Sequence, residues 1–352
     1  MPRSKSTVKG KLLTRSPGFI DLHFHGAFGI DLMSAEASSL EKMAIGLYHA
    51  GLDGFCATTL STEKKPLLET TARLGDWITS IPPKGRSEMA LPLGIHLEGP
   101  FLSLQARGAH PPGAVRPLEK KELLHLWDAS RGTLKILTLA PEELTPSLHR
   151  WLVDWSRDRK NVILSAGHSR ATTAQARQAF DQGFSAVTHA WNAMAFHQRE
   201  AGILGAALGR KGVHVELIGD GVHVSPEVVR WTCQLHKEIC WVSDCTPAAA
   251  TKRGAESHFG PLPVRLAADG SSRLPDGSLA GGGTLLPEAL RRWVESELQR
   301  GTGLRPQAVL DQHLRYACLE PLRALRMSWP ARVKRPKRLE WWLDGRELAL
   351  IV

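Results

Sequence analysis

The sequence has few cysteines, and none of them form a paired motif. Five occur among 352 residues, and no two are separated by only two residues. An odd number without such a pair argues against a disulfide framework or a zinc ribbon and fits the reduced thiols of a cytosolic protein. The chain also lacks the run of about 18 apolar residues that a membrane-spanning helix needs. Its basic N-terminus has no apolar segment typical of a secretory signal. We therefore expect a cytoplasmic protein with no membrane partner.

Acidic residues are absent from two basic segments, one at the N-terminus and one near the C-terminus. Residues 1–16 contain five basic side chains and no acid, and residues 321–338 contain seven and no acid. The net charge of +10 is therefore concentrated at the ends, and the rest of the chain is nearly neutral. This distribution favours solvated tails over a nucleic-acid recognition face. We expect no nucleic-acid partner.

Short apolar runs rich in β-branched residues alternate with longer segments of helical periodicity, which is typical of repeated strand–helix units. We predict strands over 19–23, 54–58, 93–97, 135–139, 162–166, 185–188, 214–218 and 240–243. Helices are predicted between most of them, over 35–50, 64–80, 120–129, 141–157, 172–182 and 226–237. Gly51 and Gly183 directly follow two of these helices, where a C-cap is expected. Eight such units in about 230 residues match the size of a (β/α)₈ barrel, the TIM-like member of the α/β class.

The remainder of the chain follows the eighth predicted strand. Residues 246–283 are rich in Gly, Pro and Asp-Gly pairs and are interpreted as a loop bearing hairpins, and helices are predicted over 285–300 and 306–325. The last stretch, 339–352, is predicted to form a short hairpin turning at Asp344-Gly345. We expect a barrel over 17–330, with 1–16 and 331–352 as the remnant of a small β domain.

Ionisable residues follow the predicted strands at their C-terminal ends, where the active sites of (β/α)₈ barrels lie. His23 and His25 end the first strand, and alternate residues of a strand share a face, so both imidazoles can reach one metal ion. Two histidines in this pattern are equally compatible with surface positions. The carboxylate of Glu98 follows the third strand and precedes Gly-Pro, and an ordinary loop acid is its alternative interpretation.

Three further residues complete the candidate set. His168 follows the fifth strand, His189 follows the sixth and Asp244 ends the eighth. Singly, the histidines would be structural and the aspartate a salt-bridged core acid. Together with the preceding residues they form a nitrogen and carboxylate ligand set, which suits zinc or another divalent transition metal and poorly suits magnesium. Asp244 can also take a proton from water beside the metal and pass it to a leaving amine.

The ordered set of motifs resembles the N-acetylglucosamine-6-phosphate deacetylase family of the amidohydrolase superfamily. The resembling segments are PGFIDLHFHG (17–26), GIHLEGPFLS (94–103), GAHPPG (108–113), SAGHS (165–169), THAWNAM (188–194), LIGDGVHV (217–224), VSD (242–244) and LAGG (279–282). Each segment alone is moderately specific, whereas the set in this order is highly specific. Gly282 stands where serine is usual in the family, and the terminal segments indicate a reduced β domain.

The resemblance implies roles for individual residues. Glu98, His168 and His189 match the main metal ligands, and Asp244 matches the catalytic acid and base. His110 matches a histidine that contacts the substrate and polarises the acetyl carbonyl. The remaining matches are to substrate-binding residues, with Arg199 and His223 holding the sugar phosphate: Asn192, Ala193, Arg199 and His223. Retention of both histidines of the HxH motif makes a second ion compatible with the site, with iron as an alternative to zinc.

The function that these matches imply is hydrolysis of N-acetylglucosamine 6-phosphate to glucosamine 6-phosphate and acetate, by metal-activated hydroxide with Asp244 as general acid and base. The resemblance is also compatible with a homodimer. One alternative is an amidohydrolase that acts on another N-acyl or cyclic amide. A second, from a different class, is a non-catalytic barrel that binds an anionic partner through its basic termini.

Overall fold

Eight parallel strands form the central sheet of the protein. The computed structural model describes residues 10–82, 88–159, 162–301, 303–328 and 339–352. The strands follow one another around the sheet in chain order: β2 (Phe19–Phe24), β5 (Leu52–Thr59), β6 (Leu91–Glu98), β7 (Leu134–Leu139), β8 (Ile163–Ala166), β9 (Ala186–Val187), β10 (His214–Ile218) and β11 (Ile239–Val242). Each lies within two residues of its predicted bounds, and the predicted TIM-like barrel is confirmed.

The barrel closes between the end of β2 and the residues that follow β11. The Asp244 amide donates to the His23 carbonyl at 3.0 Å, and the His25 amide donates to the Cys245 carbonyl at 2.8 Å. An isolated parallel bridge joins Phe24 to Cys245. The backbone that closes the barrel thus fixes His23 and His25 opposite Asp244 at the C-terminal edge of the strands.

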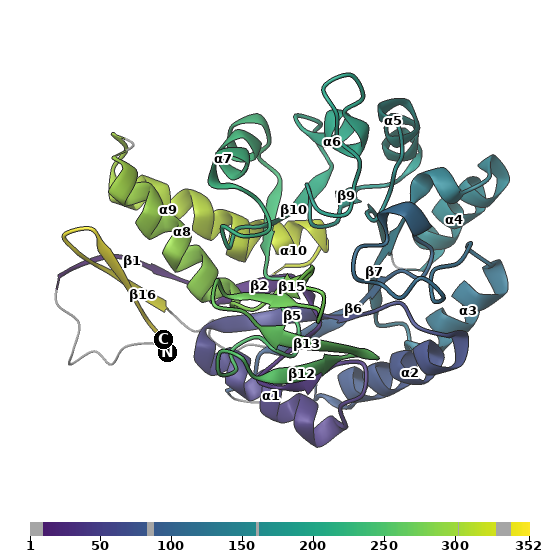
Figure 1. The fold of residues 1–352 in the computed structure, drawn as a ribbon, viewed down its shortest axis with the longest axis horizontal. Helices are drawn as coiled ribbons and strands as arrows, with labels where there is room; N and C mark the ends of the chain where they lie inside the picture. The colour runs from purple at the N-terminus through teal and green to yellow at the C-terminus, as the bar shows by residue number, and fades with distance from the viewer. Residues whose placement is uncertain (1–9, 83–87, 160–161, 302, 329–338) are drawn as a thin grey trace.

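Helices surround the barrel on its outer side, as Figure 1 shows. They are α1 (Ala37–Ala50), α2 (Lys64–Ser80), α3 (Lys120–Ala129), α4 (Pro146–Asp158), α5 (Thr173–Gln182), α6 (Gly202–Ala207), α7 (Pro226–Leu235), α8 (Leu286–Arg300), α9 (Pro306–Leu314) and α10 (Glu320–Ala324). Helix α6 was not predicted, and a π-helical turn over Arg315–Leu319 separates α9 from α10. No helix in the described ranges has the length and apolar character needed to cross a membrane.

Glycines end two of these helices as predicted. Gly51 has φ of 106°, and its amide donates to carbonyls of the last turn of α1. Gly183 has φ of 139° and caps α5 in the same way. A side chain is disfavoured at such angles, so glycine allows the chain to turn directly from helix into strand.

A four-stranded antiparallel sheet covers one side of the barrel mouth. It consists of β12 (Glu256–Phe259), β13 (Leu262–Leu266), β14 (Ser271–Arg273) and β15 (Leu279–Gly282). The hairpins predicted within 246–283 are therefore present, and they join into one sheet. Its inner face forms a second apolar cluster, which includes Leu60 and Phe259. Another short hairpin, β3 (Gly26–Ala27) with β4 (Ile30–Asp31), follows β2.

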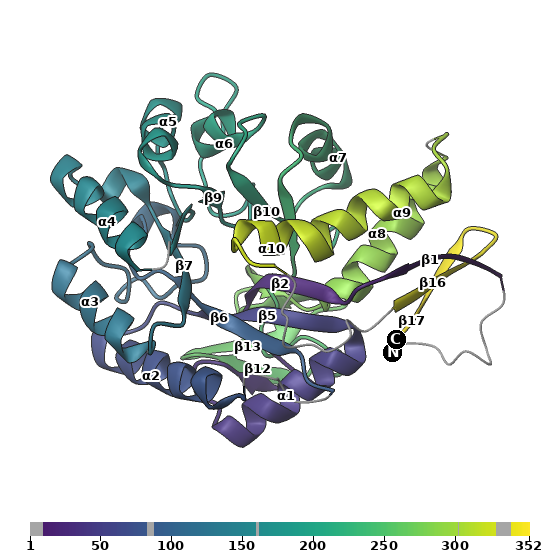
Figure 2. The same ribbon diagram turned by 180° about the vertical axis from the view of Figure 1, so that it is seen from behind.

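The chain ends meet in a separate three-stranded antiparallel sheet. Strand β1 (Lys11–Ser16) pairs with β16 (Leu339–Asp344), which pairs with β17 (Glu347–Ile351). Figures 1 and 2 both show this sheet beyond α8 and α9, outside the ring of strands. Trp341 is fully buried there, and its indole N–H donates to Ser16. The predicted sheet from the two termini is confirmed, while the division at residues 17 and 330 stays a prediction.

Candidate metal centre

Two histidines reach the centre from β2. This strand is buried along its whole length. His23 lies within it, His25 directly follows it, and the two side chains project to the same side. Their Nε2 atoms lie 3.1 Å apart. The Oδ1 atom of Asp244 lies 3.4 Å from His23 Nε2 and 3.2 Å from His25 Nε2. These three side chains form one compact group of candidate ligands.

Glu98 occupies the middle of the centre. Its Oε1 atom lies 3.0 Å from the Nε2 atoms of both His168 and His189. The same carboxylate also faces the first group, with Oε1 at 3.2 Å from His23 Nε2 and Oε2 at 3.3 Å from His25 Nε2. A single carboxylate is thus placed between two sets of imidazoles.

Hydrogen bonds on the far side of the rings determine which nitrogens face inward as acceptors. The Nδ1 atoms of His25 and His168 lie 3.2 and 3.0 Å from the carbonyl oxygens of Thr58 and Ala106. His23 Nδ1 lies 3.0 Å from a carboxylate oxygen of Glu216. A carbonyl or carboxylate can only accept, so each Nδ1 carries the proton, and each Nε2 offers a lone pair to the centre.

These imidazole nitrogens and the carboxylates of Glu98 and Asp244 converge on one region of the centre. The Nε2 atoms of His168 and His189 are 2.9 Å apart. Burial opposes protonation of His23, but the charges of Glu98 and Asp244 outweigh burial and raise its pKa well above the usual value. Burial likewise opposes ionisation of Asp244, while His23 lowers its pKa to about 2. Imidazole lone pairs beside ionised carboxylates fit a divalent transition metal.

His110 has the opposite orientation of hydrogen bonds. The backbone N–H of Ser61 donates to His110 Nδ1 at 3.1 Å, so this nitrogen is an acceptor. In the neutral ring the proton is therefore on Nε2, which faces Glu98 Oε2 at 3.2 Å. His110 brings a hydrogen-bond donor to the centre, unlike the rings whose Nε2 offers a lone pair.

A cavity of about 250 Å³ opens above these residues. Asn192, Ala193 and His223 line it, as the sequence predicted for substrate-binding residues, together with apolar Leu60 and Phe259. Arg199 is on the exposed loop before α6 and is not among the residues that line the cavity. The structure brings together every other predicted site residue; the role of each stays a prediction.

Several residues around the centre have a left-handed backbone. The φ angles are 47° at His168, 28° at His189, 50° at Ala193 and 50° at Asp244. Such angles cost a residue with a Cβ about 1–3 kcal/mol and cluster at functional sites. His168, His189 and Asp244 each stand just after the end of a strand, and all four residues line the cavity.

Sequence reasoning missed Glu216 and Ser61. Glu216 lies within β10 between apolar neighbours, 3% exposed, and the sequence alone marks it only as an acid inside a predicted strand. Its inward direction follows from the alternation of strand faces once the barrel is closed. Ser61 follows β5 and meets His110 from 49 residues away, a contact that no local pattern indicates.

Comparison with known proteins agrees with this arrangement. The amidohydrolase family model matches residues 14–256, more than half of the chain and including all six candidate ligands. The chain belongs to the amidohydrolase family.

Named relatives of this amidohydrolase are deacetylases. The N-acetylglucosamine-6-phosphate deacetylase of Bacillus subtilis is 36% identical over 287 residues, covering 79% of this chain and 69% of the relative. An N-acetylgalactosamine-6-phosphate deacetylase of Escherichia coli O157:H7 is 34% identical over 312 residues, covering 88% of this chain and 77% of the relative. The predicted family and enzyme class, a hydrolase of carbon–nitrogen bonds, are confirmed.

Solved structures of deacetylases share the fold of this amidohydrolase. A variant of the N-acetyl-D-glucosamine-6-phosphate deacetylase of Mycobacterium smegmatis, in complex with N-acetyl-D-glucosamine-6-phosphate, superposes with a TM-score of 0.80 at 27% identity, covering 95% of this chain and 86% of that one. The N-acetylglucosamine-6-phosphate deacetylase of Thermotoga maritima gives a TM-score of 0.76 at 31% identity, covering 95% and 88%.

Proposed function

We propose that this amidohydrolase removes the acetyl group of N-acetylglucosamine 6-phosphate, giving glucosamine 6-phosphate and acetate. The observation that carries the proposal is that His110 and the candidate ligand histidines surround the same carboxylate, Glu98. A donor nitrogen and several acceptor nitrogens converge on one point beside the Asp244 carboxylate, at the floor of a cavity. Amide hydrolysis needs these elements: polarisation of a carbonyl, activation of water and a proton for the leaving amine.

We propose that the centre holds one or two divalent ions, zinc foremost, with iron or another transition metal as alternatives. His23, His25 and Asp244 would hold one ion, and His168 and His189 the other, with Glu98 between them. A divalent cation bound there supplies Lewis acidity, which lowers the pKa of water and polarises a carbonyl oxygen.

The chain's own groups perform the proton transfers. Asp244 accepts a proton from the attacking water, whose oxygen forms a bond to the acetyl carbon. His110 donates a hydrogen bond from Nε2 to the carbonyl oxygen, which becomes negative as the bond forms. Asp244 then delivers its proton to the sugar nitrogen, and the carbon–nitrogen bond breaks. The second proton of the water passes from the new acetic acid to the amine, so acetate and the protonated amine result.

We propose that the residues along the cavity wall orient the phosphosugar. His223 Nδ1 lies 2.7 Å from Asp220 Oδ2. Burial opposes protonation of His223, but the Asp220 carboxylate outweighs it and raises its pKa. An imidazolium suits a phosphate or a sugar hydroxyl, and the guanidinium of Arg199 would supply a second cation from its loop.

Acetate release by purified, zinc-loaded protein tests the proposal. We expect turnover of N-acetylglucosamine 6-phosphate and a much lower kcat/KM for unphosphorylated N-acetylglucosamine. N-acetylgalactosamine 6-phosphate belongs in the same series, because one relative is named for that substrate. Good activity on an unphosphorylated amide with none on either phosphosugar would contradict the substrate class and favour the rival amidohydrolase function.

The non-catalytic alternative depends on the basic ends, most of which lie outside the described residues. It predicts salt-dependent binding of an anionic partner and no acetate release.

All five cysteines are buried and free. Because unpaired thiols are typical of reducing compartments, we propose that the enzyme acts in the cytoplasm. The homodimer stays a prediction.

A further inference from the structure

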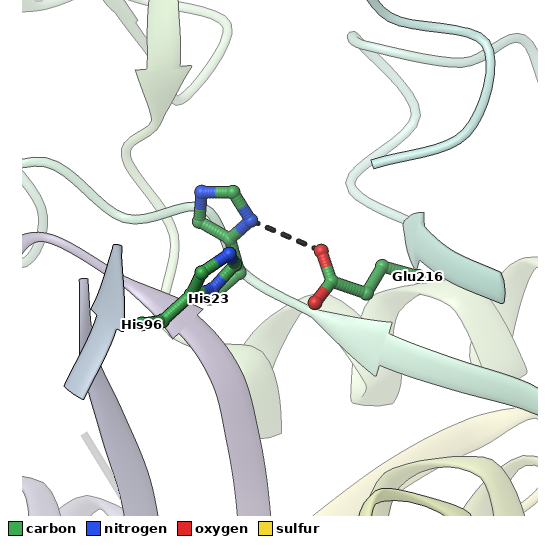
Figure 3. A group of neighbouring side chains, drawn as sticks. All are labelled: His23, His96 and Glu216. Atoms are coloured by element: carbon green, nitrogen blue, oxygen red, sulfur yellow. Dashed lines mark hydrogen bonds and ion pairs between the residues drawn. The ribbon is translucent and has the colours of Figure 1, made fainter. Parts of the chain in front are cut away.

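Glu216 lies behind the metal centre, and the proposed chemistry assigns it no role. It comes from β10, is 3% exposed, and its Oε2 atom lies 3.0 Å from His23 Nδ1 (Figure 3). The backbone N–H of His189 donates to the same oxygen at 3.3 Å. One buried carboxylate oxygen therefore contacts two candidate ligand residues from opposite groups of the centre.

His96 completes this buried cluster without being available for a metal. Its Nδ1 atom lies 3.0 Å from the Leu22 carbonyl, and its Nε2 atom lies 2.7 Å from the Thr138 hydroxyl. Both ring nitrogens are thus occupied. The ring stands edge-on to His23, with centroids 4.7 Å apart. Packing and hydrogen bonds therefore hold together the cluster of His23, His96 and Glu216 behind the centre. The cluster is not a further cation site.

The contact between Glu216 and His23 determines what His23 can do. Ionised Glu216 is an acceptor only, so His23 Nδ1 must donate to it, and the Nε2 lone pair is directed at Glu98 and Asp244. A carboxylate behind a ligating imidazole also makes it a stronger base, and loss of such a partner typically costs about 10–100-fold in metal affinity.

We propose that Glu216 is a positioning residue that orients His23, sets its tautomer and strengthens its hold on the metal. The inference rests on the proposed function only in that it assumes a divalent ion at this centre. It requires no particular substrate.

A zinc titration of the metal-free protein, in competition with a chromophoric chelator, tests this role. For Glu216→Gln, which keeps the shape and removes the charge, we expect the affinity of at least one zinc equivalent to fall about 10–100-fold. Glu320→Gln is the matched control, because Glu320 is 1% exposed but bonds to Arg315 and Arg323 away from the centre. The control is expected to bind zinc as the wild type does.

Identical zinc titrations of Glu216→Gln and the wild type would overturn the proposal. If the glutamine variant does not fold, Glu216→Asp keeps the charge but withdraws it from His23, and a weakened zinc equivalent is again expected. A second measurement uses the cobalt-loaded wild type and therefore requires no variant. In its proton NMR spectrum the His23 ring N–H signal should be protected from solvent exchange, and rapid exchange would contradict the role. The two hypotheses can fail separately. If the wild type releases no acetate but Glu216→Gln still binds zinc more weakly than the wild type, the inference is supported and only the proposed function is refuted.

Discussion

His110 and His168 stand with ring centroids 4.6 Å apart and carry their protons on opposite nitrogens. The backbone N–H of Ser61 donates to His110 Nδ1, whereas His168 Nδ1 donates to the carbonyl of Ala106. Two rings that face the same carboxylate, Glu98, therefore differ in function. His168 presents a lone pair suited to a cation, and His110 presents an N–H suited to a developing oxyanion.

Replacement of His110 should impair catalysis without loss of metal. In His110→Asn the shorter amide can still meet Ser61 but brings no donor to the centre. We expect kcat to fall by about 10²–10³-fold, the usual cost of a missing oxyanion donor. Zinc content, measured by elemental analysis, should equal that of the wild type. Loss of zinc from this variant would instead show that His110 is a ligand.

Asp244→Asn should remove proton transfer while leaving most of the centre in place. An amide of the same shape cannot accept a proton from water, and general acid–base catalysis contributes roughly 10²–10⁴-fold. We therefore expect a loss in kcat of at least that size, measured as acetate release. Glu98, His168 and His189 are untouched, so at least one zinc ion should remain bound. Near-normal turnover would exclude Asp244 as the proton carrier.

The role of Arg199 separates a phosphosugar substrate from an uncharged amide. If its guanidinium binds phosphate, Arg199→Ala should raise KM for N-acetylglucosamine 6-phosphate by about tenfold or more, since a charge-assisted hydrogen bond is worth about 1.5–3 kcal/mol. Arg177→Ala, on the exposed surface of α5, is the matched control and should leave KM unchanged. Equal KM values for both variants would mean that residues other than Arg199 bind the phosphate.

The backbone at Gly282 lies very close to the backbone at Ser243. The sequence indicated only that Gly282 replaces the serine usual in the family. A Cβ on this residue would overlap the carbonyl oxygen of Ser243, beside Asp244. Gly282→Ser should therefore displace the β15 edge and lower the free energy of unfolding by about 1–3 kcal/mol, as overpacking does. Gly113→Ser is the control, because its Cβ would meet nothing within 4 Å. Chemical denaturation of both variants measures the difference; equal stability would mean that the backbone yields at this point.

Patterns along one strand or at its end were readable from the sequence, whereas contacts between distant strands were not. His23 and His25 were predictable because alternation places them on one face, and Asp244 because it follows a strand. Glu216 was not, since a charged residue among apolar neighbours has meaning only once the barrel directs it at His23. For Arg199 the sequence predicted a substrate contact that the cavity lining does not include. Its assignment came from a motif match, and the loop that carries it is exposed.

A buried histidine that is not part of the metal centre should make stability depend on pH. His313 is surrounded by Trp241, Trp293 and Tyr316, and the Trp293 indole N–H donates to its Nε2 at 3.1 Å. Burial lowers its pKa to about 3, from about 6.5 in the unfolded chain. Between these values the unfolded state binds a proton that the folded state does not, so this stabilisation is complete above pH 6.5 and is lost as the pH falls.

His313→Gln isolates that contribution, because glutamine can still accept from Trp293 and does not titrate. The free energy of unfolding of the wild type minus that of the variant should decrease by about 2 kcal/mol between pH 7 and pH 5, at about 1.4 kcal/mol per pH unit below 6.5. Urea denaturation at the two pH values measures it, and the subtraction removes the effect of the other buried histidines. A difference independent of pH would mean that His313 takes up its proton in the folded protein as readily as in the unfolded chain.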